Sequence, residues 1–121
     1  MTLVGASSLL LGLVHVFGGG RDVLRPMLRA DFDPVARATM HACWHAITVY
    51  LFATGAILLW RGLAPPAGFD PLAATIFASY AAVAAVFVLI VARTRVPAAW
   101  RRLPQWIPFS IMGVAGLATV L

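Results

Sequence analysis

The sequence predicts an all-α integral membrane protein, a bundle of four transmembrane helices, and three observations support this. The 121 residues are 62% hydrophobic and 11% charged, with a mean hydropathy of +0.93, whereas about a quarter of the residues of a soluble domain are charged. The charges lie in short clusters, separated by four stretches that contain no Asp, Glu, Lys or Arg: residues 1–20, 38–60, 71–92 and 103–121. A helix needs roughly 20 apolar residues to cross the hydrocarbon core, so each stretch predicts one transmembrane helix. We expect the four helices to form one membrane domain, 1–121.

The first span is predicted over residues 2–20. The segment MTLVGASSLLLGLVHVFGGG lacks the basic start and the small-residue cleavage signal of a secretory signal peptide. We therefore expect it to remain in the protein as the first helix.

The next two spans begin at matching Asp-Pro pairs. Asp33 and Pro34 precede a predicted helix over 34–60, and Asp70 and Pro71 precede one over 71–92. Asp is a favoured N-cap residue and Pro is favoured at the first helical position. Between these helices, LAPPAGFDP has the composition of a turn.

The fourth span, over 104–121, carries the weakest signal. Pro104 and Pro108 indicate that its helix begins near Trp106, which leaves 16 residues up to Leu121. The preceding segment TRVPAAWRRLPQW mixes Arg and Trp, a composition typical of the membrane interface. For residues 21–29 the spacing of Arg and Leu predicts a short amphipathic helix on the membrane surface.

The arginines predict the orientation. The connections 21–37 and 93–102 together carry eight Arg, whereas 61–70 carries one. Because short cytoplasmic loops are enriched in basic residues, both chain ends are expected outside, in a multi-pass protein of a bacterial inner membrane. The net charge is +5, and all nine basic residues are Arg, with no Lys. It predicts contact with anionic lipid head groups and no nucleic-acid partner, and the Arg bias fits a GC-rich bacterial genome.

The three histidines lie in one half of the predicted membrane. His15 and His45 are each four residues to the cytoplasmic side of the centre of their span, or about 6 Å at 1.5 Å per residue. His41 lies one turn further out, about 12 Å from the midplane. Because ionisable groups inside a membrane are functional candidates, the three imidazoles form the candidate site.

Helical periodicity predicts that the first two helices meet along these positions. One face of the second helix holds His41, His45, Thr48, Phe52, Gly55 and Leu59, and one face of the first holds Gly5, Ser8, Gly12, His15 and Gly19. Small residues let membrane helices approach closely. Superposing the two faces brings His15 near His45, and His41 near the glycines at 18–20.

This arrangement favours a cofactor, with two forms left open. A transition metal would take His15, His41 and His45 as ligands, with water or Asp22 completing its shell. A b-type haem would take His15 and His45 as axial ligands, with Arg21 or Arg37 at its propionates.

Other interpretations stay open beside the cofactor. The histidines could serve only as interhelical hydrogen-bonding groups, with Ser8, Thr39 and Thr48 as available partners. The chain could be a non-catalytic accessory subunit of a larger membrane complex, or a homo-oligomer, that packs through its Gly and Ala faces. It could also bind a quinone or a lipid through a His and Trp44. The lone Cys43 is expected to be a small packing residue.

Two segments carry a resemblance. HVFGGGRDVLRPML, followed by HACWHAITVYLF, resembles small, uncharacterised four-helix proteins of bacterial inner membranes. The resemblance covers roughly the first half of the chain and implies no activity, since none is assigned to that group.

Overall fold

The computed structural model describes residues 1–120, and that part of the chain is helical with no strand, which confirms the all-α class. The elements in order are α1 (Thr2–Val14), the π-helix η1 (His15–Leu24), α2 (Arg25–Arg29), α3 (Pro34–Leu63), α4 (Pro71–Arg93), α5 (Ala99–Arg102) and α6 (Trp106–Leu117).

Three helices are long and apolar enough to cross a membrane. They are α3, α4 and the continuous run Thr2–Arg29, in which η1 joins α1 to α2. The expected separate surface helix at 21–29 is therefore wrong: the three glycines at 18–20 allow a wider helical turn instead of ending the helix. The fourth predicted span corresponds to α6, which has 12 residues and a length of about 18 Å. It is shorter than the roughly 30 Å hydrocarbon core.

Both Asp-Pro pairs start helices as predicted. The Asp33 carboxylate accepts hydrogen bonds from the backbone N–H groups of Val35 and Ala36. The Asp70 carboxylate likewise accepts from Leu72 and Ala73. These bonds satisfy amides that have no partner within the first helical turn, so the local sequence sets the starts of α3 and α4.

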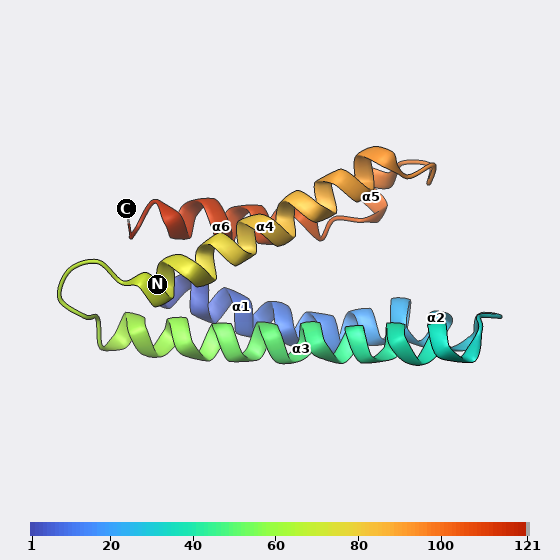
Figure 1. Ribbon diagram of the computed structural model, residues 1–121, viewed down its shortest axis with the longest axis horizontal. Coiled ribbons are helices and arrows are strands. Elements are labelled where there is room, and N and C mark those ends of the chain that lie inside the picture. Colours follow the sequence, from blue (N-terminus) through green and yellow to red (C-terminus); the bar gives the residue numbers. More distant parts are fainter. Residues whose placement is uncertain (121) are drawn as a thin grey trace.

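The helices form two antiparallel pairs, α1–η1–α2 with α3 and α4 with α6, which lie as two layers (Figure 1). Glycines allow each close approach. A Cβ atom on Gly5 would lie 2.8 Å from the carbonyl oxygen of Gly55, and one on Gly113 would lie 2.6 Å from the backbone nitrogen of Ala81. Contacts this close exclude any larger residue unless a backbone moves.

Buried hydroxyl groups connect the two pairs. The Tyr80 hydroxyl of α4 donates to Ser8 Oγ of α1 over 2.8 Å and lies 2.6 Å from Thr54 Oγ1 of α3. Ser8 in turn donates to the carbonyl oxygen of Leu51. Tyr80 is completely buried, in a core that includes Phe77. Since unpaired polar groups are costly in an apolar interior, this network fixes how the two pairs meet.

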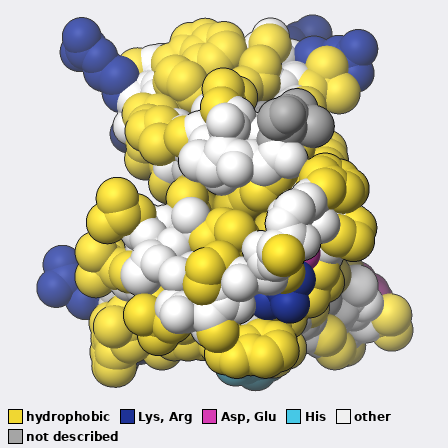
Figure 2. Space-filling model, turned by 90° about the vertical axis from the view of Figure 1, so that its left-hand side faces the viewer, with side chains coloured by type: hydrophobic (Ala, Val, Ile, Leu, Met, Phe, Trp, Pro, Cys, Tyr) yellow, Lys and Arg dark blue, Asp and Glu magenta, His cyan; other side chains and the backbone are white. Residues whose placement is uncertain are grey.

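The two ends of the molecule differ in charge. The N-terminus, the α3–α4 connection and the last described residues lie at one end, and α2 and α5 lie at the other (Figure 1). Figure 2 looks onto the first end, which is mostly hydrophobic or uncharged, with basic side chains mainly at the margins. Eight of the nine arginines belong to the segments at the second end, which we call the arginine-rich end.

Candidate functional site

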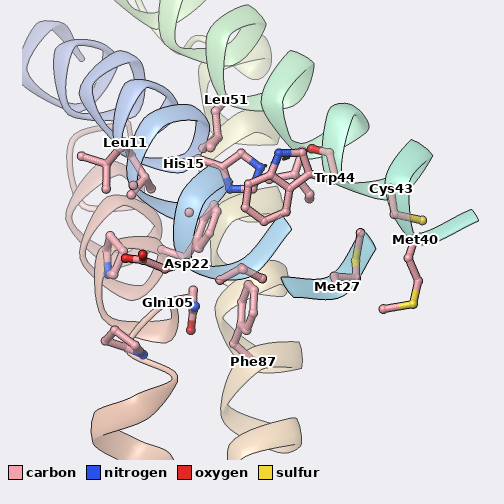
Figure 3. A pocket seen from close by; sticks show the side chains of 18 of the residues that line it. Leu11, His15, Asp22, Met27, Met40, Cys43, Trp44, Leu51, Phe87 and Gln105 are labelled. Carbon is pink, nitrogen blue, oxygen red and sulfur yellow. Dashed lines mark hydrogen bonds between the residues drawn. The ribbon is translucent and has the colours of Figure 1, made fainter. Parts of the chain in front are cut away.

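An apolar cavity of about 720 Å³ lies between the two helix pairs, towards the arginine-rich end. Its walls come from α1, η1, α2, α3, α4 and the start of α6 (Figure 3). The apolar lining includes Leu11, Val14, Val23, Met27, Met40, Ile47, Leu51, Phe87 and Phe109, and the polar side chains are His15, Asp22, Thr39 and Gln105. Cavities of this size and character are typical of small-molecule sites.

The π-helix η1 shapes one wall of the cavity. The backbone N–H of Arg25 bonds to the carbonyl of Gly20, five residues earlier, which is the π-helical pattern and is often found at functional sites. A Cβ atom on Gly19 would lie 2.7 Å from Cη2 of Trp44. The absence of a side chain at Gly19 therefore makes room for the indole.

His15, the first residue of η1, packs on Trp44 of α3. The two rings stack with centroids 3.8 Å apart and planes inclined by 19°. His15 Nε2 lies 3.3 Å from the backbone carbonyl oxygen of Trp44. Both residues line the cavity (Figure 3), so a titratable ring and a large aromatic ring form a single unit in its wall.

The expected partner of His15 was His45, and the structure places Trp44 against it instead. The antiparallel register agrees with the prediction, and three residues of the predicted α3 face, Phe52, Gly55 and Leu59, do lie against glycines of α1. The difference lies nearer the arginine-rich end, where Trp44, and not His45, packs against His15 and Gly19. The reason is steric, because the indole fits the space at Gly19 and turns His45 away.

His41 and His45 pair with each other on α3. Their Nε2 atoms are 3.0 Å apart, and the side chain of His45 is exposed. Neither lines the cavity that contains His15. In the described part of the chain no three His, Cys, Asp or Glu side chains come together as a metal-binding group, so the expected set of His15, His41 and His45 is not assembled there.

The two arginines expected near haem propionates make other contacts. Arg21 Nε is 3.0 Å from Asp22 Oδ1, and both side chains are well exposed. Arg37 donates to the backbone carbonyls of Ala30 and Phe32. Arg37 therefore stabilises the connection before α3. Asp22, the partner of Arg21, also lines the cavity.

The opposite end of the molecule carries one buried ion pair. Arg61 Nε lies 2.7 Å from Asp70 Oδ2, and Asp70 is 2% exposed. The hydrogen bond from Arg61, assisted by the amides of Ala73 and Leu72, holds the pKa of the Asp70 carboxyl below its usual value. This pair joins the end of α3 to the start of α4 and lies outside the cavity lining.

Sequence reasoning missed the hydroxyl network of Ser8, Thr54 and Tyr80, and also Gln105 in the cavity wall. Thr54 follows Tyr50 by one helical turn and donates to its carbonyl oxygen. That spacing of polar residues within an apolar span was a usable signal. Gln105 precedes α6 in a segment without helical periodicity, so only the fold reveals its place.

Comparison of the chain with protein-family models, with curated proteins and with solved structures gives no match. The site is therefore interpreted from its own geometry, as an apolar cavity with a His–Trp unit in its wall.

Proposed function

We propose that this protein binds an amphiphilic small molecule of the quinone or lipid type in the cavity between its helix pairs. The observation that carries the proposal is the cavity of about 720 Å³ with a stacked His15–Trp44 unit in a mostly apolar wall. Apolar walls with a few placed polar groups bury the body of a ligand and orient its head. No chemical step is required of the site, and we propose a binding protein.

The distribution of polar groups supports an amphiphile over a purely apolar ligand. Leu11, Leu51 and Phe109 form deeper lining, whereas Asp22 and Thr39 belong to the turns nearest the arginine-rich end. A bound molecule would therefore place its tail towards the centre of the bundle and its head towards that end.

We further propose a bacterial inner-membrane location with four spans and both ends outside. The excess of eight Arg to one at the arginine-rich end supports a cytoplasmic position for it. Anionic lipid head groups are its expected contacts. We also propose that a second copy of the chain, or a larger membrane complex, is a partner. The exposed apolar side chains of α3 and α4 would form the contact surface.

The proposal is tested by filling the cavity with a side chain that the fold tolerates. Gly18 lines the cavity, and a Cβ atom there would meet only Val14, at 3.9 Å. Gly18→Leu should expel the ligand without unfolding the helix. Gly20→Leu is the matched control, because Gly20 has open space around it and is not part of the lining.

The measurement is mass spectrometry of amphiphiles that co-purify in mild detergent, together with tryptophan fluorescence on titration with a long-chain alkylphenol. We expect about one molecule per chain in the wild type and in Gly20→Leu, and a loss of tenfold or more in Gly18→Leu. Equal occupancy in all three proteins would disprove the proposal.

The His41–His45 pair favours a second candidate, a transition-metal site on the surface of α3. Two imidazoles at i and i+4, with their Nε2 atoms 3.0 Å apart, present two nitrogen ligands of the kind that Zn²⁺ and Cu²⁺ accept. Titration with Zn²⁺ should show binding that His41→Ala removes and His15→Ala retains. The haem hypothesis, with His15 and His45 as axial ligands, predicts a Soret band that His15→Ala or His45→Ala removes.

A further inference from the structure

We infer that the ligand of the cavity carries a hydroxyl or other hydrogen-bond donor in its head group, which His15 Nδ1 accepts. This inference rests on the proposed function and narrows it to a ligand class: phenols, quinols and lipid alcohols, as opposed to ligands with only carbonyl or ether oxygens.

The contact of His15 with Trp44 determines which ring nitrogen holds the proton. A backbone carbonyl oxygen can only accept a hydrogen bond, so the contact of His15 Nε2 with the Trp44 oxygen at 3.3 Å requires a proton on Nε2. In a neutral imidazole the other nitrogen is then an acceptor. The acceptor of His15 is therefore Nδ1.

Nδ1 is free to meet a ligand. Among the described residues His15 forms one side-chain hydrogen bond, through Nε2. The buried side-chain nitrogen and oxygen atoms without a partner in that part of the chain are Arg37 Nε and Gln105 Oε1. Since Nδ1 is unbonded and is not one of these buried atoms, it retains accessible surface, on a residue that lines the cavity (Figure 3).

Two other polar groups of the lining also leave acceptors unused. The Asp22 carboxylate contacts Arg21 through Oδ1, so Oδ2 remains available. Gln105 Oε1 is buried without a partner. Figure 3 shows His15, Asp22 and Gln105 around the same hollow. Three acceptors without a partner in one lining, His15 Nδ1, Asp22 Oδ2 and Gln105 Oε1, are complemented by a ligand that donates.

The test compares two probes that differ only in the donor: a long-chain alkylphenol and its methyl ether. Binding is measured by tryptophan fluorescence of the full chain in lipid nanodiscs, with Gly18→Leu as the background for partition into the bilayer. We expect the phenol to bind about two- to tenfold more tightly, the usual range for one added hydrogen bond.

His15→Phe keeps a ring that can stack on Trp44 but removes the acceptor. It should therefore bind both probes with similar affinity. His45→Phe, at an exposed position outside the lining, should retain the preference for the phenol. A wild type that binds the two probes equally would overturn the donor inference and leave the cavity function standing. A wild type that binds neither above the Gly18→Leu background would overturn the proposed function as well.

Discussion

At the scale of single residues, the wall of the cavity depends on the missing side chain of Gly19. Because a Cβ atom there would lie 2.7 Å from Trp44 Cη2, Gly19→Ala should displace the indole from His15. We expect a loss of about 1–3 kcal/mol, as in other overpacked sites, and a shifted tryptophan emission. Thermal unfolding and fluorescence in detergent measure both effects.

The neighbouring Gly20 provides the control for that substitution. Nothing lies within 4 Å of a Cβ atom there, and Ala is a better helix former than Gly by up to about 1 kcal/mol. Gly20→Ala should therefore leave the emission unchanged and stability equal or higher. If both alanine variants behaved alike, the close contact at Gly19 would not be what holds Trp44 in place.

The ion pair of Asp70 predicts a pH dependence of stability. Arg61 lowers the pKa of the Asp70 carboxyl below its ordinary value of 3.8. The stabilisation is therefore fully present above pH 3.8 and is lost as the pH falls through the lowered pKa. Asp70→Asn keeps a capping side chain but removes the charge. We expect the wild type to be more stable than this variant at pH 7, and the difference to shrink towards pH 3 in thermal unfolding.

Asp31 supplies the matched carboxylate for that experiment. It is exposed and lies in the connection before α3, at the other end of the molecule. Asp31→Asn should follow the wild-type pH profile. A gap between wild type and Asp70→Asn that stayed constant from pH 7 to pH 3 would contradict a role for the ionised Asp70.

At the candidate site, part of the arrangement of His15 was predictable from the sequence and part was not. The antiparallel register, which places His15 at the level of residues 44 and 45 of α3, was predictable from the helix rise, because it depends only on position along the chain. The partner of His15 was not, because Trp44 and His45 are neighbours in the sequence, and periodicity alone cannot weigh the fit of an indole at Gly19 against the packing of an imidazole.

At the scale of elements, α6 depends on its glycines to pack on α4. A Cβ atom on Gly113 would lie 2.6 Å from the backbone nitrogen of Ala81, and backbone cannot move aside without shifting a helix. We expect Gly113→Leu to separate α6 from α4 and to cost at least about 1–3 kcal/mol. Ala115→Leu, at an exposed position of the same helix, should be nearly neutral. Unfolding in detergent compares the two variants, and equal stability would argue against close packing of α6.

Most of the helices were predictable, but the continuous helical run from Thr2 to Arg29 was not. The Asp-Pro pairs marked the starts of α3 and α4, because N-capping is local chemistry. The spacing of Arg and Leu predicted a separate helix over 21–29, yet the first helix continues into this segment through η1. Glycine tolerates both an interrupted and a continuous helix, and in the continuous form Trp44 packs against His15 and Gly19 of this segment.

At the scale of the whole molecule, the hydroxyl network decides how the two helix pairs meet. Tyr80 on α4 reaches Ser8 on α1 and lies beside Thr54 on α3, so three helices are joined at one point. The cavity lies further along the same junction, towards the arginine-rich end. A fixed contact at Tyr80 thus lets the pairs diverge beyond it and enclose space for a ligand.

The number of spans is the property of the whole molecule that most needs measurement. Helix α6 is about 18 Å long, shorter than a hydrocarbon core of roughly 30 Å, yet it runs antiparallel to α4 and returns to the end that carries the N-terminus (Figure 1). Four spans predict that alkaline phosphatase fused after α6 is active and that a green fluorescent protein there is dark. Fusions in the connection 64–69 should behave in the same way. The decisive comparison is between the two fusion sites. A fluorescent protein after α6 together with an active phosphatase at 64–69 would mean that α6 does not cross the membrane. In that case the chain after α6 would stay on the same side as the arginines.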